Sequence, residues 1–182
     1  MLKNKKILLG ISGGIAAYKC PELIRQLIAE QAEVKVIATE SALEFVTTVT
    51  LQTVSRNKVY SKVFEPICDF NPEHISHADW GDILLVAPAT ANIIGKFACG
   101  IADDALSTLF LAFDKPVFIA PAMNNRMYTH LIVQRNIKQL QAIEVQLIEP
   151  TYGELACNSV GKGRMEEPEN IVAYLKDYFD KD

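Results

Sequence analysis

Long hydrophobic runs are missing from this sequence of 182 residues. No apolar stretch approaches the roughly 18–20 residues of a membrane span, so we expect no membrane association. The basic start of the chain imitates a signal peptide only in part, because glycine and serine residues at positions 10–14 interrupt the apolar stretch that follows. We therefore expect a cytoplasmic protein.

Positive charge is not in excess, since 18 Lys and Arg residues stand against 22 Asp and Glu residues and give a net charge of −4. A general nucleic-acid-binding surface needs a basic excess, so we expect no nucleic-acid partner. Cysteine is scarce and scattered, at Cys20, Cys68, Cys99 and Cys157, which argues against zinc and thioredoxin-like motifs. His74 and His77 could share a helix face, but no third ligand follows at a convincing spacing, so we predict no metal site.

What the sequence does have is an alternation of apolar segments of strand length with amphipathic segments. We predict strands at residues 7–9, 34–38, 83–87, 117–120 and 145–148, and helices at 15–29, 42–46, 51–54, 93–98, 105–113, 127–140 and 171–179. Pro21 should kink the first helix or delay its regular part. Continuous apolar strands separated by helices indicate a parallel sheet covered on both faces. We therefore predict a single α/β domain over residues 1–182, with a flavodoxin-like or Rossmann-like, doubly wound parallel sheet.

Small, hydroxyl and amide residues follow the ends of four predicted strands, where such sheets bind their ligands. Gly13 and Gly14 would let a phosphate approach a helix N-terminus, although a tight turn would need a glycine as well. Thr39 and Ser41 suit a phosphate better than a ribose, but they could equally be helix caps. Neither a G-x-G-x-x-G pattern nor a P-loop is present, so we favour a mononucleotide phosphate over a dinucleotide.

Two further strand ends carry amides. Thr90 and Asn92 could reach a flavin ring or its ribityl chain, and Thr90 could alternatively cap a helix. In the segment PAMNNRM, at residues 121–127, a proline, an alanine and a methionine follow a buried-looking strand, and two asparagines come next. Asn124 is therefore expected either to cap the next helix or to bind a substrate.

Five segments occur in order along the chain: GISGGIAAYK, HISHADWGD, APATANIIGK, PAMNNRMY and ACNSVGKGRM. Together they resemble the flavin-containing cysteine decarboxylases, from about Lys5 to Met165. The resemblance implies FMN as the cofactor, with contacts from Gly13, Gly14, Ile15, Thr39, Ser41, Thr90, Ala91, Asn92 and Ala122. It implies catalytic roles for His74, Asn124 and Cys157, and substrate contacts from Met123, Asn124, Ala156, Lys162 and Arg164.

The activity that this resemblance implies is the FMN-dependent decarboxylation of 4′-phosphopantothenoylcysteine to 4′-phosphopantetheine in coenzyme A biosynthesis. The enzyme would be a stand-alone carboxy-lyase, and a separate ligase would supply its substrate. FMN would oxidise the thiol side of the substrate, so that the carbanion left by CO2 is delocalised into a thiocarbonyl. His74 would be the base or electrostatic partner, Asn124 would hold the carboxylate, and Cys157 would supply a proton. His77 falls on a position that the family does not use, and we expect Asn125 to be the helix cap.

A flexible flap is expected at about residues 151–166, where this chain reads A-C-N-S at 156–159 and the family often reads A-C-G-D. Lys162 and Arg164 in this segment could help to hold the substrate phosphate. The alternatives are a peptidyl-cysteine decarboxylase of lantibiotic synthesis, a flavin prenyltransferase and a non-enzymatic flavin-binding regulatory protein. The complete His, Asn and Cys set argues against the regulator. The resemblance also implies a homotrimer or homododecamer with FMN near the subunit contacts.

Overall fold

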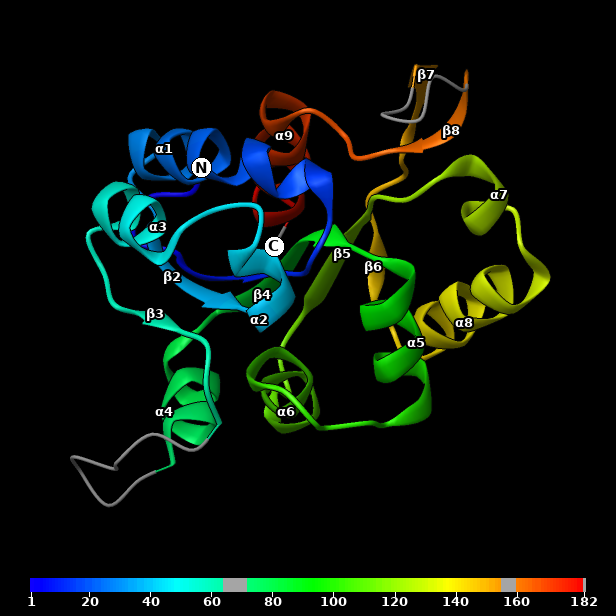
Figure 1. Ribbon diagram of the computed structural model, residues 1–182. Coiled ribbons are helices and arrows are strands. Elements are labelled where there is room, and N and C mark those ends of the chain that lie inside the picture. The colour runs from blue at the N-terminus through cyan, green and yellow to red at the C-terminus, as the bar shows by residue number, and fades with distance from the viewer. Residues whose placement is uncertain (64–71, 155–159, 182) are drawn as a thin grey trace.

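The computed structural model describes residues 1–63, 72–154 and 160–181 (Figure 1). Its centre is a six-stranded parallel sheet with the strand order β3-β2-β1-β4-β5-β6. The strands are β1 (Lys6–Ile11), β2 (Glu33–Ala38), β3 (Val59–Tyr60), β4 (Ile83–Ala89), β5 (Val117–Pro121) and β6 (Gln146–Leu147). All seven residues of β4 are buried, as expected for an inner strand covered on both faces. The predicted doubly wound α/β fold is confirmed.

Helices cover both faces of this sheet (Figure 1). One face packs against α1 (Cys20–Ala29), α3 (Thr48–Ser55) and α9 (Pro168–Phe179). The other packs against α4 (Glu73–Trp80), α5 (Ala91–Cys99), α6 (Ala105–Ala112) and α8 (Leu131–Ala142). Successive strand residues point to opposite faces, so Leu9 joins the first core and Leu8 joins the second. The inner strands therefore contribute to two separate hydrophobic cores.

The strand order reverses between β1 and β4, and this reversal fixes where a ligand can bind. The chain builds β1, β2 and β3 outward in one direction and then returns to form β4 on the other side of β1. The connections that leave β1 and β4 consequently diverge to opposite faces, which opens a crevice beyond the carboxyl ends of these two strands. Ser12, directly after β1, spans it by donating from Oγ to the Pro88 carbonyl at 2.7 Å.

The first predicted helix, at residues 15–29, has two parts. A 3₁₀ helix, η1, covers Ile15–Lys19, and the regular helix α1 begins at Cys20. Pro21 lies in the first turn of α1, where its missing N–H costs no hydrogen bond. The expectation that Pro21 delays the regular helix is confirmed.

Other predicted elements differ in detail. The helix predicted at 127–140 is divided into α7 (Asn125–Tyr128) and α8, because the His130 side chain accepts a hydrogen bond from the Ile132 N–H at 3.2 Å and starts a new helix. The short helix α2 covers Glu40–Leu43. Strand β3, helix α4 and the antiparallel hairpin of β7 (Thr151–Glu154) and β8 (Val160–Arg164) were not expected. The hairpin forms part of the segment in which the sequence predicts a flap.

None of the helices in the described part of the chain has the length and apolar character that a membrane crossing requires. The same residues contain no group of three His, Cys, Asp or Glu side chains placed to hold a metal ion.

Candidate functional site

A cavity of about 1300 Å³ lies beyond the carboxyl ends of the strands. Its wall includes all nine positions that the resemblance assigns to FMN, namely Gly13, Gly14, Ile15, Thr39, Ser41, Thr90, Ala91, Asn92 and Ala122. Met123, Asn124 and Arg164, three of the residues expected to contact substrate, lie on the same wall. Small-molecule sites usually measure about 300–1,000 Å³, so this cavity has room for a cofactor and a second molecule together.

The turn after β1 lies very close to the start of α2. A Cβ atom added to Gly13 would lie 2.4 Å from the Ser41 Cβ atom and 2.9 Å from the Ser41 carbonyl oxygen. Only glycine fits this approach, which agrees with the tight-turn reading and brings Ser41 to the glycine turn. The Thr39 side chain caps α2 by accepting a hydrogen bond from the Ala42 N–H at 3.2 Å. Thr39 is therefore both a helix cap and a wall residue.

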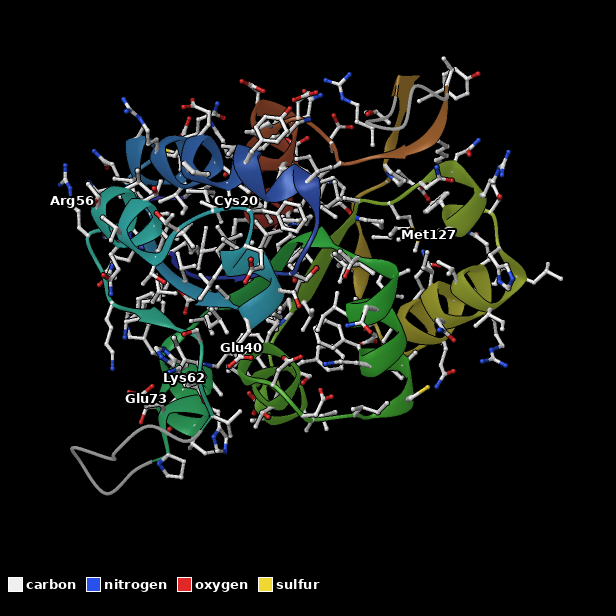
Figure 2. All side chains as sticks on the ribbon, viewed as in Figure 1. Cys20, Glu40, Arg56, Lys62, Glu73 and Met127 are labelled. Carbon is white, nitrogen blue, oxygen red and sulfur yellow. The ribbon has the colours of Figure 1, made fainter. Side chains whose placement is uncertain are left out.

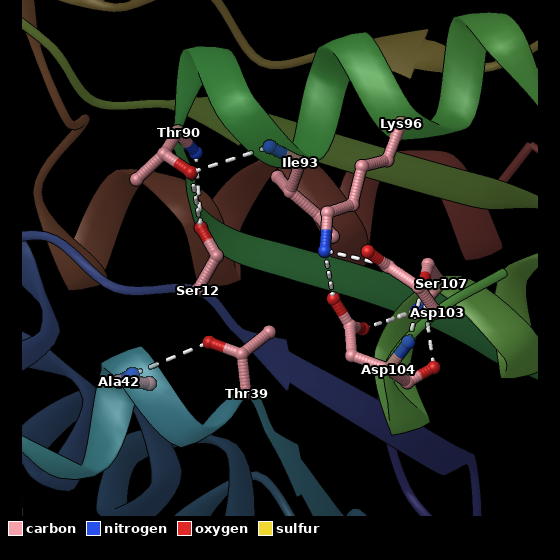
Figure 3. Close-up of polar contacts among 9 residues, drawn as sticks. All are labelled: Ser12, Thr39, Ala42, Thr90, Ile93, Lys96, Asp103, Asp104 and Ser107. Atoms are coloured by element: carbon pink, nitrogen blue, oxygen red, sulfur yellow. Dashed lines mark hydrogen bonds and ion pairs between the residues drawn. The ribbon is translucent and has the colours of Figure 1, made fainter. Parts of the chain in front are cut away.

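Thr90 has the same double role at the crevice (Figure 3). Its Oγ1 atom accepts a hydrogen bond from the Ile93 N–H at 3.4 Å and so caps α5. The Thr90 N–H in turn donates to Ser12 Oγ at 3.0 Å. These bonds tie the end of β1 to the start of α5 and hold the adjacent Ala91 and Asn92 at the cavity wall.

A charged cluster that the sequence analysis missed lies on another part of the wall (Figure 3). Lys96 Nζ contacts Asp103 Oδ1 at 2.5 Å and Asp104 Oδ2 at 2.6 Å. Burial lowers the pKa of Lys96, but the hydrogen bonds and charges of the two aspartates outweigh it, and the net pKa is raised. Asp104 and Ser107 also form a capping box at the start of α6, which was the available sequence signal. The wall therefore carries a fixed ammonium group between two carboxylates.

Asn124, and not Asn125, caps the helix after β5. The Asn124 Oδ1 atom accepts a hydrogen bond from the Arg126 N–H at 2.8 Å. The expectation that Asn125 would be the cap is wrong, because α7 begins at Asn125 itself and the cap precedes it. An N–H donor can be met only by the amide oxygen, so the hydrogen bond fixes which end of the Asn124 amide faces the start of α7.

His74 and Lys162 are not among the described residues that form this wall. His74 is half-buried on α4, and Figure 2 shows its neighbour Glu73 well apart from the wall residue Met127 but on the same side of the view as Lys62, another wall residue. Lys162 Nζ pairs with Glu149 Oε2 at 2.7 Å. Arg164 does line the cavity and pairs with Glu167. Cys68, Ala156 and Cys157 lie outside the described residues.

Lys19 is another wall residue that sequence reasoning missed. It is only 8% exposed, and its Nζ atom donates to Glu167 Oε2 at 2.9 Å and to the Met165 carbonyl at 3.4 Å. Glu167 also accepts from Arg164 at 2.6 Å, so one carboxylate joins η1 to the end of β8. A lysine in a helical segment usually lies in solvent, and the sequence offers no signal that this one is buried.

His77 is a half-buried residue of α4 whose ring lies 5.2 Å from the ring of Tyr60. Its Nδ1 atom is buried without a hydrogen-bond partner among the described residues. Burial, followed by the charges of Lys35 and Lys58, lowers the His77 pKa to about 4, so the ring is neutral at pH 7. His77 is not among the cavity-lining residues in the described ranges, in keeping with the family pattern.

The fold and the cavity wall define the class of α/β domains that bind a mononucleotide where the strand order of the sheet reverses. The chain belongs to the Flavoprotein family, whose sequence pattern matches residues 1–180. It is 53% identical over 182 residues to the coenzyme A biosynthesis bifunctional protein CoaBC of Bacillus subtilis. That match covers 98% of this chain but 44% of the relative, so the chain spans less than half of the relative's length. The expected stand-alone form with a separate ligase stays a prediction.

Two solved structures are similar over nearly the whole chain. A cysteine-to-serine mutant of PPC decarboxylase, complexed with pantothenoylaminoethenethiol, matches with a TM-score of 0.88 and 32% identity, covering 98% of this chain and 100% of that one. The FMN-binding protein AtHal3 matches with a TM-score of 0.86 and 32% identity, covering 99% of each chain. Both similarities support the flavodoxin-like architecture described above.

Proposed function

We propose that this chain is an FMN-dependent carboxy-lyase that decarboxylates 4′-phosphopantothenoylcysteine to 4′-phosphopantetheine in coenzyme A biosynthesis. The observation that carries the proposal is the convergence of nine expected FMN residues with Met123, Asn124 and Arg164 on one cavity. The similar PPC decarboxylase, complexed with a pantothenoyl thiol compound, supports this substrate class. The similar FMN-binding protein supports the cofactor.

The residues on the wall fit a flavin mononucleotide. The Gly13–Ser41 contact and the Thr39 hydroxyl form a small polar end that suits the phosphate. Thr90, Ala91 and Asn92 follow at the crevice, where small side chains leave room for a flat ring. Bound FMN would supply the two-electron oxidation and re-reduction that let a cysteine carboxylate leave.

Asn124 would hold the carboxylate that is lost. Its Oδ1 atom accepts from the Arg126 N–H, and its Nδ2 group is the donor proposed to meet the substrate carboxylate. An amide donor suits a carboxylate, because it forms a charge-assisted hydrogen bond without carrying a charge of its own. Arg164, oriented by Glu167, would meet the phosphate end of the substrate.

His74 would act at the cavity of a neighbouring copy. Within one chain it is not among the described residues of the wall that carries Asn124. In the homotrimer or homododecamer that the resemblance implies, α4 of one copy would complete the site of the next. His74 is the proposed base or electrostatic partner there, because an imidazole ring can accept and donate a proton, and Cys157 stays the proposed proton donor.

The test is an anaerobic incubation of the purified, FMN-loaded protein with phosphopantothenoylcysteine, followed by mass spectrometry. Loss of CO2 from the substrate is expected. Asn124→Asp keeps the helix cap, since aspartate caps as well as asparagine, but it replaces the amide donor with a like charge that repels the carboxylate. Its flavin spectrum and thermal stability should be retained while turnover falls at least about 10²-fold, the scale of losing one fixed donor to a developing charge.

The second variant is His74→Asn, and its matched control is His130→Asn. His130 is exposed and caps α8, and asparagine can cap in its place, so this variant should keep full activity. His74→Asn should bind FMN and lose activity. A protein that takes up no FMN, or a flavin-loaded protein that releases no CO2, would refute the proposed function.

A further inference from the structure

We infer that strand β8 holds in place the 121–125 loop, which we define as the last residue of β5, residues 122–124 and the first residue of α7. Gly163 is then a positioning residue that sets the Asn124 amide against the substrate carboxylate. The inference rests on the proposed function, because it concerns the group that Asn124 would hold. It assigns a role to the two glycines of the G-K-G sequence at residues 161–163.

Gly163 contacts the loop through its backbone. The Met123 N–H donates to the Gly163 carbonyl oxygen at 2.9 Å. A Cβ atom on Gly163 would lie 2.3 Å from the Met123 carbonyl oxygen and 3.5 Å from the Asn124 carbonyl carbon. Gly163 also has a φ of +147°, which L side chains rarely adopt. Any side chain here would therefore press directly on the peptide that joins Met123 to Asn124.

Gly161 makes the equivalent contact one residue further along the loop. A Cβ atom on Gly161 would lie 2.4 Å from Asn125 Nδ2 and 2.7 Å from Asn125 Cβ. Residues two apart lie on the same face of a strand, so the two glycines form one smooth surface against the loop. A Cβ atom on Gly153, in the partner strand β7, would lie at least 3.7 Å from its described neighbours. The close approach is thus specific to β8.

The end of β8 is tied to the body of the domain. Arg164 and Lys19 share the carboxylate of Glu167, and Met165 is buried in the core next to α9. Strand β8 is therefore held by η1 on one side and by the loop on the other. Asn124 receives its position from this strand as well as from its own helix α7.

The expected consequence is a selective loss of carboxylate recognition. To restore an ordinary contact of 3.4 Å, the Met123–Asn124 peptide would have to retreat by about 1 Å from an alanine at residue 163. Misplacement by about 1 Å costs on the order of 10²-fold in rate when a group must meet a reacting atom. Eight of the nine proposed FMN contacts, among them Gly13, Ser41 and Thr90, lie on other segments of the wall, and Ala122 alone lies in the 121–125 loop.

The experiment compares Gly163→Ala with Gly153→Ala in the FMN-loaded protein. Binding of substrate and of the product 4′-phosphopantetheine, which lacks the carboxylate, is measured together with kcat and KM. Gly163→Ala should lower kcat/KM on the order of 10²-fold, while product affinity stays unchanged and FMN stays bound through its contacts on the other segments of the wall. Gly153→Ala should match the wild-type protein. Equal loss of substrate and product affinity, or no loss of either, would overturn the inference.

Two further variants separate the possible failures. Gly161→Ala lies outside the positive-φ region and pushes on the Asn125 side chain only, so it should fold and show a smaller loss of the same kind. Asn124→Ala should show the same selectivity against the carboxylate as Gly163→Ala. If Asn124→Ala has no such selectivity, the proposed role of Asn124 fails. If Asn124→Ala has it and both glycine variants lack it, the positioning role of β8 fails.

Discussion

Replacing Lys19 by methionine tests whether its buried ion pair stabilises the domain. Methionine is similar in length and fills the same space, but it removes the ammonium group that joins η1 to Glu167. Lys19 is 8% exposed and Glu167 is 37% exposed, so the pair is shielded from water on one side only. Glu167 keeps its second partner, Arg164, in the variant.

The magnitude follows from this geometry. Removing one partner of a fully buried pair costs about 3–5 kcal/mol, and an exposed pair contributes about 0–1 kcal/mol. Because Glu167 stays paired and partly solvated, the loss should correspond to one charge-assisted hydrogen bond of about 1.5–3 kcal/mol. Lys19→Met also removes the free-energy cost of burying the ammonium group, so the expected loss of unfolding free energy is about 1.5–2 kcal/mol. In a chain of this size that lowers Tm by roughly 3–8 °C.

The assay is a double-mutant cycle of Lys19→Met and Glu167→Gln, read by urea unfolding and by Tm. A matched control is Lys176→Met, because Lys176 pairs with Glu30 at the same 2.9 Å distance but with 36% and 37% of the side chains exposed. The control should change stability by less than about 0.5 kcal/mol. A coupling energy near zero, or a Lys19→Met protein as stable as the wild type, would refute the reasoning.

The pH dependence of this coupling provides a second readout. The hydrogen bond from Lys19 is the largest cause that holds the pKa of Glu167 below its ordinary value of 4.5. A carboxylate with a lowered folded-state pKa stabilises the fold at pH values above its unfolded pKa, and this contribution is lost as the pH falls through the folded value. The coupling should therefore be the same at about pH 7 and pH 5 and disappear only at lower pH.

Two other predictions concern residues away from the cavity wall. The pKa of His77 is about 4 in the folded protein, against an ordinary histidine pKa of 6.5 in the unfolded chain. Between pH 6.5 and pH 4 the unfolded chain therefore binds the proton more tightly, and the free energy of unfolding should fall as the pH is lowered through this range. His77→Phe should weaken this dependence in urea unfolding, and an unchanged pH profile would contradict it. Gly95→Ala should raise stability by about 0.5–1 kcal/mol, because a helix-interior glycine is replaced where the new Cβ has 3.7 Å of clearance from Asn136. A lower Tm would disprove that reasoning.

The core of the fold could be predicted because its central strands are continuous apolar segments. Strand β3 pairs only two residues, Val59 and Tyr60, which is too short for any periodicity. Helix α4 buries only Ala78 fully, so its sequence looks like a polar loop. The hairpin was not predicted because the glycines at residues 153, 161 and 163 are typical of a loop. Gly161 and Gly163 lie in strand β8, and their missing side chains allow β8 to approach the 121–125 loop.

At the site, residues that lie directly after a strand could be predicted from the sequence. Residues that are placed by contacts distant in sequence could not. The strand-end rule brings Gly13, Thr39 and Thr90 to one wall regardless of detail. The choice between Asn124 and Asn125 as cap depends on a helix start that shifts by a single residue. The bond between Lys19 and Glu167 joins residues 148 positions apart, and no local pattern encodes it.

The two edge strands of the sheet, β3 and β6, each pair only two residues with their neighbours. An edge this short exposes few backbone donors and acceptors to a second chain. Copies of this domain are therefore poorly suited to join through a continuous intermolecular sheet, and the same shortness protects the folded protein from fibrillar aggregation. Contacts between copies at the six-stranded sheet would instead use side chains on its helices and loops, and such contacts can be altered one residue at a time without disrupting the sheet.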